Sequence, residues 1–307
     1  MFDAPHFHDE NAARQHLEAI RWPDGPVCPH CGAVGDHYRL EGTGGAKGKK
    51  ARPGLLKCKD CREQFSVTVG TVFEHSKIPL TKWLLATHLM CSSKKGISSH
   101  QIHRTLGVTY KTAWFMTHRI REAMAPAKDA GPIGGPGKTV EADETYLAKS
   151  PKTRKPKDQP LHARTAPGVM SLMERGGNVR SMTLTEANVR QHLVTHLDER
   201  SRLVTDGSTM YKGVMPTTDQ HESVDHSKFE WTRGDVHTNT LEGYFSIFKR
   251  GLVGTYQHMD KRHLHRYLAE FDFRMNNRAK FGINDAERTE IALNAIGGKR
   301  LTYRRPD

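Results

Sequence analysis

The sequence predicts a multidomain α/β protein, in which a cysteine-bearing ribbon and a helical region precede a mixed α/β layer domain. Three observations support this fold class. Two C-x-x-C pairs lie near the N-terminus, helical patterns separated by a glycine follow them, and strand-like and helix-like patterns alternate beyond a Gly/Pro-rich linker. With 307 residues the chain is long enough for two or three domains and at least one sizeable core.

The ribbon is predicted from four cysteines. Cys28 and Cys31 form the pair VCPHCG, and Cys58 and Cys61 form the pair KCKDCRE, with the flexible segment EGTGGAKGKKARPG between them. Each pair places two thiolates on a tight turn, and two such turns complete the tetrahedral sulfur set of a structural Zn²⁺. The alternative is a set of unrelated thiols. Because four cysteines leave no ligand position open, we expect this zinc to support folding and not catalysis.

The helical region follows the ribbon. Residues 80–90 predict one amphipathic helix with Thr81 as a possible cap, and Cys91 is expected in the core. Ser98 or Ser99 then caps a short helix through Leu106, Gly107 makes a turn, and a longer helix runs from Thr109 to Met124. This order of elements is typical of a helix-turn-helix.

The longer helix carries side-chain types suited to phosphate and base-edge contact, namely Tyr110, Lys111, Thr112, His118, Arg119 and Arg121. The alternative is a helical hairpin that only packs. The formal net charge of +13 favours nucleic acid as the partner, because clustered Lys and Arg gain free energy by displacing counterions from phosphates.

Beyond the linker, the pattern TVEADETYL predicts a strand with Val140 and Ala142 on one face and Glu141 and Asp143 on the other. A basic loop at 149–164, a hairpin turning at 176–178, a helix capped by Asn188 and a strand ending in Asp206 come next. This order of elements, a strand, a hairpin, a helix, a strand and a further helix, is typical of a mixed α/β layer fold.

That further helix has two stripes. Leu241, Phe245, Phe248 and Leu252 form an apolar stripe, and Asn239, Glu242, Ser246 and Lys249 form a polar stripe beside it. Carboxylates at two strand ends and on a following helix can converge at one edge of a sheet. Such carboxylates can hold a pair of Mg²⁺ or Mn²⁺ ions that activate a water or a 3′-hydroxyl and stabilise the leaving oxygen of a phosphodiester.

The motifs RWPDGPVCPHCG, KCKDCREQFSVTVGTVFEHSKIPLTKW, VEADETYL, LVTDGSTMY, VHTNTLEGYFSIFKRG and YLAEFDFRMNNR together resemble those of bacterial insertion-sequence transposases of the ISXO2-like group. These proteins carry a zinc ribbon ahead of a DDE-type integrase-like domain. The resemblance runs from about residue 7 to about residue 280. It implies a ribonuclease-H-like catalytic core, divalent-metal chemistry, and cleavage and strand transfer at the ends of a mobile element.

When the motifs of this group are matched to the present sequence, the resemblance implies that Asp143 and Asp206 are the two aspartates of the catalytic and Mg²⁺-binding site. The third position of the catalytic site in this group is Asn or Glu, so Asn239 and Glu242 are both candidates for it. We favour Glu242 as the metal ligand because a carboxylate brings a charge that an amide lacks, with Asn239 as a supporting ligand or as a residue that orients the ligand. The resemblance assigns Lys249 to a DNA phosphate or terminal base.

The expected domains are an N-terminal helix and zinc ribbon (1–75), a helix-turn-helix region (76–125), a linker (126–138), a ribonuclease-H-like DDE domain (139–282) and a basic C-terminal tail (283–307). The expected function is that of a DNA transposase acting on terminal inverted repeats and target DNA, as a homo-oligomer in the synaptic complex. The alternative is a DNA-binding regulator with a catalytically dead core. Without an apolar span or signal core, we expect a cytoplasmic, nucleoid-associated protein and no membrane partner.

Overall fold

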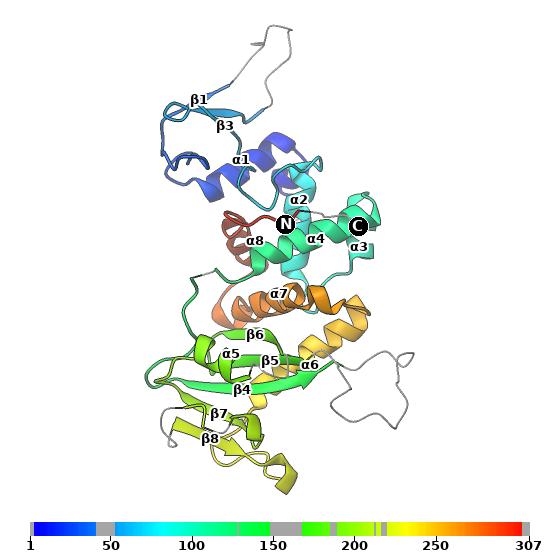
Figure 1. Cartoon of the computed structure of the whole chain (residues 1–307). Helices are drawn as coiled ribbons and strands as arrows, with labels where there is room; N and C mark the ends of the chain where they lie inside the picture. Colours follow the sequence, from blue (N-terminus) through cyan, green and yellow to red (C-terminus); the bar gives the residue numbers. More distant parts are fainter. Residues whose placement is uncertain are drawn as a thin grey trace. The chain divides into compact units, whose positions relative to one another are not determined.

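The computed structural model describes residues 3–40, 53–127, 129–147, 168–184, 189–211, 213–215 and 220–302. The chain forms two compact units, residues 1–124 with 279–307, and residues 125–278 (Figure 1). Three expectations lie outside the described residues: the basic loop at 149–164, the cap Asn188, and most of the flexible segment between the cysteine pairs.

A small antiparallel sheet forms the ribbon of the first unit. Its strands are β1 (His37–Arg39), β2 (Leu56–Cys58) and β3 (Gln64–Phe65), in the order β1-β2-β3. The buried side chains of Leu56 and Phe65 face each other across β2 and β3. This contact supports the two turns that carry the cysteines.

Five helices complete the described part of the first unit: α1 (Glu10–Arg21), α2 (Leu80–Ser92), α3 (Ser99–Leu106), α4 (Tyr110–Met124) and α8 (Asp285–Asn294). The expected short helix, glycine turn and long helix are confirmed. Ser98 caps α3 by accepting a hydrogen bond from the Gln101 amide, and Gly107 ends it in the left-handed conformation at φ 59°.

The start of α2 differs from the expectation of a Thr81 cap. The helix begins at Leu80, and the Glu10 carboxylate of α1 accepts hydrogen bonds from the Leu80 and Thr81 amides at 2.7 and 3.2 Å. A carboxylate at this position also interacts favourably with the helix dipole. Cys91 is fully buried, as expected.

The expectation of a basic tail at 283–307 is wrong for ten of these 25 residues. Residues 285–294 form α8, which begins with a capping box between Asn284 and Glu287. The helix packs against α1, α2 and α4, with Ala292 and Leu293 buried. Its apolar residues are too few to stand out in the sequence, yet they complete the core of the first unit.

The second unit contains a five-stranded mixed sheet, ordered β6-β5-β4-β7-β8. Its strands are β4 (Thr139–Tyr146), β5 (Gly168–Glu174), β6 (Val179–Leu184), β7 (Arg202–Asp206) and β8 (His221–Val224). The strand β4 pairs antiparallel with β5 and parallel with β7, and β7 pairs parallel with β8. The expected strands and hairpin are therefore confirmed, while β8, which is short and polar, was not predicted.

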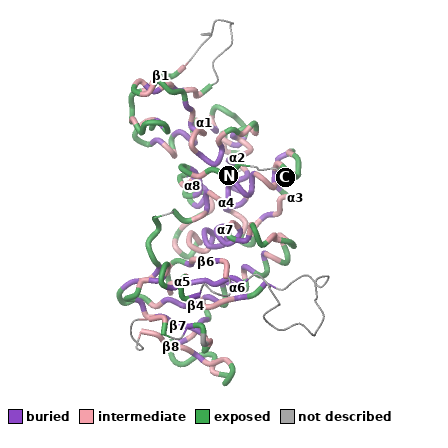
Figure 2. The backbone as a smooth tube through the Cα atoms, viewed as in Figure 1, coloured by how far each residue is buried: buried purple, intermediate pink, exposed green. Residues whose placement is uncertain are grey.

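Two apolar clusters lie on the faces of this sheet. One gathers Val140 and Ala142 of β4 with α5 (Val189–His196), and the other gathers Val169 and Met173 of β5 with α6 and α7. The helix α6 (Asn239–Gly251) continues into one π-helical turn at Leu252–Tyr256, and α7 spans Leu264–Asn276. Figure 2 shows the central strands as the most buried part of this unit. The alternation in β4 therefore directs Glu141 and Asp143 to the α6 side.

No helix in the described ranges is long and apolar enough to cross a membrane.

Candidate catalytic centre and metal sites

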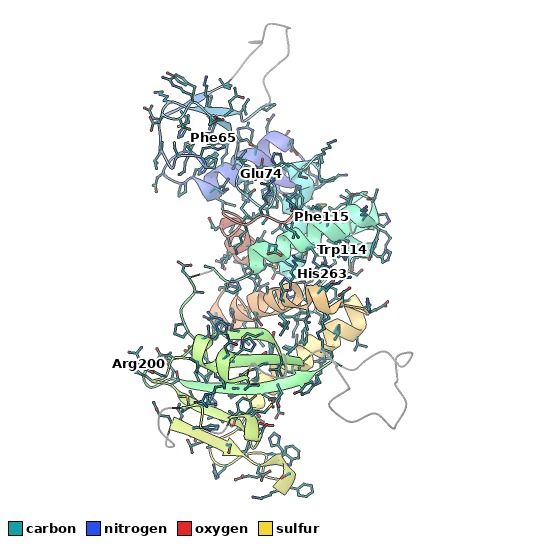
Figure 3. The ribbon with its side chains drawn as sticks, in the orientation of Figure 1. Phe65, Glu74, Trp114, Phe115, Arg200 and His263 are labelled. Carbon is teal, nitrogen blue, oxygen red and sulfur yellow. The ribbon has the colours of Figure 1, made fainter. Side chains whose placement is uncertain are left out.

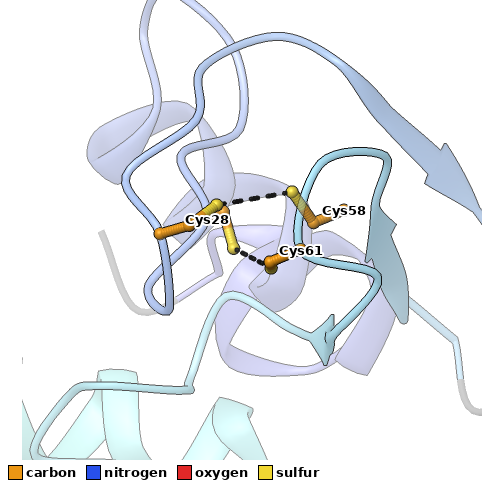
Figure 4. A group of neighbouring side chains, drawn as sticks. Cys28, Cys58 and Cys61 are labelled. Atoms are coloured by element: carbon orange, nitrogen blue, oxygen red, sulfur yellow. Dashed lines mark hydrogen bonds between the residues drawn. The ribbon is translucent and has the colours of Figure 1, made fainter.

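The four cysteines of the ribbon converge on one point. Cys28 and Cys31 lie on the turn after α1, Cys58 ends β2, and Cys61 lies on the turn before β3. The Cys28 and Cys61 sulfurs are 3.6 Å apart, the Cys31 and Cys58 sulfurs are 3.7 Å apart, and all four lie within 4.8 Å of one another. Figure 4 shows three of these side chains gathered between the two turns.

These distances fit a structural zinc ion. With Zn–S bonds of about 2.3 Å, a tetrahedral site places its sulfurs about 3.8 Å apart. Burial raises the pKa of the Cys28 thiol, but the backbone amides of Cys31 and His30 and neighbouring thiols lower it to about 7, whereas the pKa of Cys61 is raised to about 12 by burial and by its neighbouring thiols. It is therefore the arrangement of the four sulfurs that suits a bound metal, and it leaves no position for a substrate.

Asp143 and Asp206 lie side by side at one edge of the second sheet. Ala142 of β4 pairs with Thr205 of the parallel strand β7, so Asp143 and Asp206 follow this pair at the same level. Residues at the same level of parallel strands point to the same face of a sheet. The parallel pairing of β4 and β7 therefore brings together two carboxylates that are 63 positions apart in the sequence.

The electrostatics of Asp143 reflect this arrangement. Burial raises its pKa, the Glu144 backbone amide lowers it with a 2.8 Å hydrogen bond, and the charges of Glu144, Asp206 and Glu242 raise it further, to about 7. The carboxylates of the cluster thus lie near enough to interact. Among the described residues, however, only the four cysteines gather their ligand atoms into a group that could hold a metal ion as it stands, and Asp143, Asp206 and Glu242 do not form such a group in this structure.

The helix α6 presents the polar stripe expected from its sequence. Its members Asn239, Glu242, Ser246 and Lys249 are all exposed, while Leu241, Phe245 and Phe248 are buried. The Thr238 hydroxyl donates a 3.2 Å hydrogen bond to the Glu242 carboxylate. The charge of Glu242 reaches Asp143, whereas the backbone amide of Asn239 contacts the His237 ring at 3.4 Å. Lys249 lies two turns further along the helix.

Sequence reasoning missed the roles of the two glutamates that flank Asp143. The Tyr211 hydroxyl, from a fully buried side chain, donates a 2.5 Å hydrogen bond to Glu144. Burial is also the main cause that raises the Glu144 pKa. Glu141 is fully buried against α6. The expectation of a strand end at Asp143 is wrong, because β4 continues to Tyr146. The run EADE therefore signals an acidic strand, and only the packing separates its three carboxylates.

Half of the polar residues expected to contact DNA from α4 are buried. His118, Arg119 and Arg121 are core residues, whereas Tyr110 and Lys111 are exposed and Thr112 is partly exposed. The Arg119 guanidinium donates to the Glu74 carbonyl at 2.6 Å and lies 5.6 Å from the Phe115 ring. The His118 ring lies 4.1 Å from the Trp114 ring. Figure 3 labels Trp114 and Phe115 on α4. The expectation for these three basic residues is therefore wrong, because they pack inside the first unit.

Comparisons with known proteins match both candidate sites. A family model described as an ISXO2-like transposase domain matches residues 134–276, which include the carboxylate cluster. A model described as a transposase zinc-ribbon domain matches residues 8–64, which include the four cysteines. A relative from Halobacterium salinarum, described as an uncharacterized protein in transposable element ISH50, is 30% identical over 285 residues. The match covers 87% of this chain and 91% of the relative.

Proposed function

Because the chain belongs to the family of ISXO2-like transposases, we propose that it binds the terminal inverted repeats of an insertion sequence and catalyses metal-dependent strand cleavage and strand transfer. The observation that carries this proposal is the pairing of β4 with β7. It aligns Asp143 with Asp206 on the face covered by α6, whose Glu242 lies near enough to raise the Asp143 pKa. The order β6-β5-β4-β7-β8 supports a ribonuclease-H-like core.

Asp143, Asp206 and Glu242 would hold the divalent ions. Their donor set fits Mg²⁺ or Mn²⁺, because both ions prefer carboxylate oxygens, and the repulsion that raises the Asp143 pKa is relieved by a cation. When bound, a pair of such ions activates a water or a 3′-hydroxyl and stabilises the leaving oxygen of the phosphodiester. Lys249 is exposed on the same stripe and is suited to contact a DNA phosphate.

The first unit would bind the element ends. A Zn²⁺ held by the four cysteines fixes the ribbon, and the N-terminal turn of α4 presents Tyr110 and Lys111 to solvent. The net charge of +13 favours DNA over neutral partners. With its basic core residues buried, α4 offers only its first turn for contact with the groove, and we propose that base recognition is concentrated there.

The direct test is incubation of the purified chain with Mg²⁺ or Mn²⁺ and labelled DNA carrying the element end. We expect nicks at the end of the inverted repeat, followed by joining to target DNA, and neither product from a scrambled repeat. A preparation that binds the ends but neither nicks nor joins them would favour the catalytically dead DNA-binding regulator. Cleavage that ignores the repeat sequence would indicate a plain nuclease.

The third metal ligand is tested by comparing Glu242→Gln with Asn239→Ala. We expect Glu242→Gln to lower the cleavage rate about a hundredfold, because it removes a charge next to Asp143, and Asn239→Ala to lower it less than about tenfold. Rates are measured at matched occupancy of the DNA ends. Ser246→Ala, on the same exposed stripe, is the control and should cleave at the wild-type rate. Full activity of Glu242→Gln would reverse the assignment.

A further inference from the structure

Glu141 is a buried carboxylate for which the proposed reaction has no role. It lies on β4 two residues before Asp143, on the same face of the strand, and its side chain is fully buried. Its Oε1 accepts hydrogen bonds from Arg175 Nε at 2.8 Å and Thr240 Oγ1 at 2.9 Å. Its Oε2 accepts one from the Leu241 amide at 2.9 Å. Two of its three donors therefore belong to the first turn of α6.

The partner Arg175 extends this contact to the segment before α6. It follows β5 directly, and besides its ion pair with Glu141 it donates to the backbone carbonyls of Asp235 at 2.6 Å and His237 at 2.7 Å. The chain entering α6 is thus held at residues 235, 237, 240 and 241 by one ion pair. All of these contacts lie within the second unit.

The first turn of α6 has no side-chain cap of its own. The side chain of Thr238, the N-cap residue, accepts no hydrogen bond from the helix backbone, and its hydroxyl instead donates to Glu242. The first amides of a helix have no partner within the helix, and the helix dipole favours a negative charge beside them. Glu141 supplies both a hydrogen-bond acceptor and that charge from the neighbouring strand.

We infer that Glu141 is a positioning residue of the metal site, which ties the strand carrying Asp143 to the helical turn carrying Glu242. Leu241, which it binds, directly precedes Glu242, and Glu141 itself is two residues from Asp143. The spacing between these two proposed ligands therefore depends on one buried carboxylate. This inference rests on the proposed function only in taking Asp143 and Glu242 as metal ligands.

The test measures Mn²⁺ affinity directly, from the electron paramagnetic resonance signal of free Mn²⁺ titrated with zinc-loaded full-length protein. The Mn²⁺ that the Asp143→Asn variant still binds is taken as binding outside the site and is subtracted. We expect Glu141→Gln to weaken the Asp143-dependent Mn²⁺ affinity by about tenfold or more, as is usual when a group that orients a metal ligand is lost. Excess Mn²⁺ should then restore part of the cleavage rate. A dissociation constant within about twofold of wild type overturns the inference.

Glu270→Gln is the matched control. Glu270 is also fully buried in the second unit and paired with an arginine, Arg274, and it accepts a 2.6 Å hydrogen bond from the Tyr256 hydroxyl. Tyr256 and Arg274 both lie outside the first turn of α6. We expect this variant to lose thermal stability and to keep the wild-type Mn²⁺ affinity. Equal loss of Mn²⁺ affinity in both variants would mean that Glu141 acts only through general stability.

Thr240→Ala keeps the inference testable if Glu141→Gln does not fold. It removes one donor to Glu141 and retains the ion pair with Arg175, so we expect a roughly fivefold loss of Mn²⁺ affinity, the effect of one hydrogen bond. Unchanged affinity in this variant would count against the inference. Asp143-dependent Mn²⁺ binding without cleavage by wild type would instead refute the proposed function and leave the role of Glu141 intact.

Discussion

Replacing Asp143 by Asn is expected to lower DNA cleavage and strand transfer by about a thousandfold or more while leaving the affinity for element ends within about twofold. The loss of a charged metal ligand removes several kcal/mol of transition-state stabilisation, and each 1.4 kcal/mol corresponds to about tenfold in rate. DNA-end binding should persist because Asp143 belongs to the second unit, whereas the ribbon and α4 belong to the first. Gel-based cleavage at saturating DNA provides the measurement.

The matched control for this variant is Asp260→Asn. Asp260 is a more exposed aspartate of the same unit, bonded to Arg262 and outside the carboxylate cluster. We expect it to cleave at the wild-type rate. Wild-type activity in Asp143→Asn would remove Asp143 from the site and with it the proposed mechanism.

The same substitution should stabilise the fold when no divalent ion is added. Burial and the neighbouring carboxylates raise the Asp143 pKa from 3.8 to about 7 in the folded state. A carboxyl group whose pKa is raised by folding does not lower the free energy of unfolding at pH values below its pKa in the unfolded state, near 4. The loss of stability grows as the pH rises and is complete above about pH 7. The free energy of unfolding of Asp143→Asn should therefore exceed that of wild type by up to about 4 kcal/mol at pH 8. The difference should vanish near pH 4, as denaturant titrations at the two pH values would show.

The second large effect is expected from the zinc ligands. Replacing Cys58 by Ser should abolish zinc binding and unfold the ribbon, because structural zinc sites in small ribbons supply about 10 kcal/mol or more of folding free energy. Cys58 is fully buried and its sulfur lies 3.7 Å from that of Cys31, so a serine there leaves an incomplete donor set. Zinc content by mass spectrometry, the protection of residues 28–65 from hydrogen exchange and the affinity for element ends should all fall together.

The second unit provides an internal reference for this experiment. It forms a separate compact unit with its own core, so its amides should stay protected in Cys58→Ser. The matched control is Cys91→Ala, which removes the one cysteine outside the cluster from the α2 core. It should retain one zinc ion and bind element ends normally. A full zinc complement in Cys58→Ser would refute the four-cysteine site.

Local patterns in the sequence were sufficient for most helices and strands. The apolar and polar stripes of α6, the hairpin of β5 and β6 and the turn at Gly107 each depend on residues a few positions apart, so their periodicity and turn chemistry are visible in the sequence. The strand β8 and the helix α8 were missed. Both are short, and their burial comes from partners far along the chain, β7 for the strand and α1 and α2 for the helix.

Surface exposure was the main property that residue type did not predict. His118, Arg119 and Arg121 have the chemistry of DNA-contacting residues, but backbone carbonyls, hydroxyls and aromatic rings surround them in the core. A long basic side chain can be buried when part of its guanidinium finds acceptors and its stem packs on apolar groups, and the sequence of α4 alone contains no signal of those partners.

By itself, the sequence determined the four-cysteine cluster, the two strands that carry Asp143 and Asp206, and the membership in a transposase family that its motifs indicate. Only the tertiary structure decided how the acidic run EADE is divided. Side-chain alternation and the parallel pairing of β4 with β7 direct Asp143 toward Asp206, Glu144 toward Tyr211 and Glu141 into the start of α6. Neighbouring carboxylates in a strand are chemically alike, and they acquire different roles only from the partners that packing places around each of them.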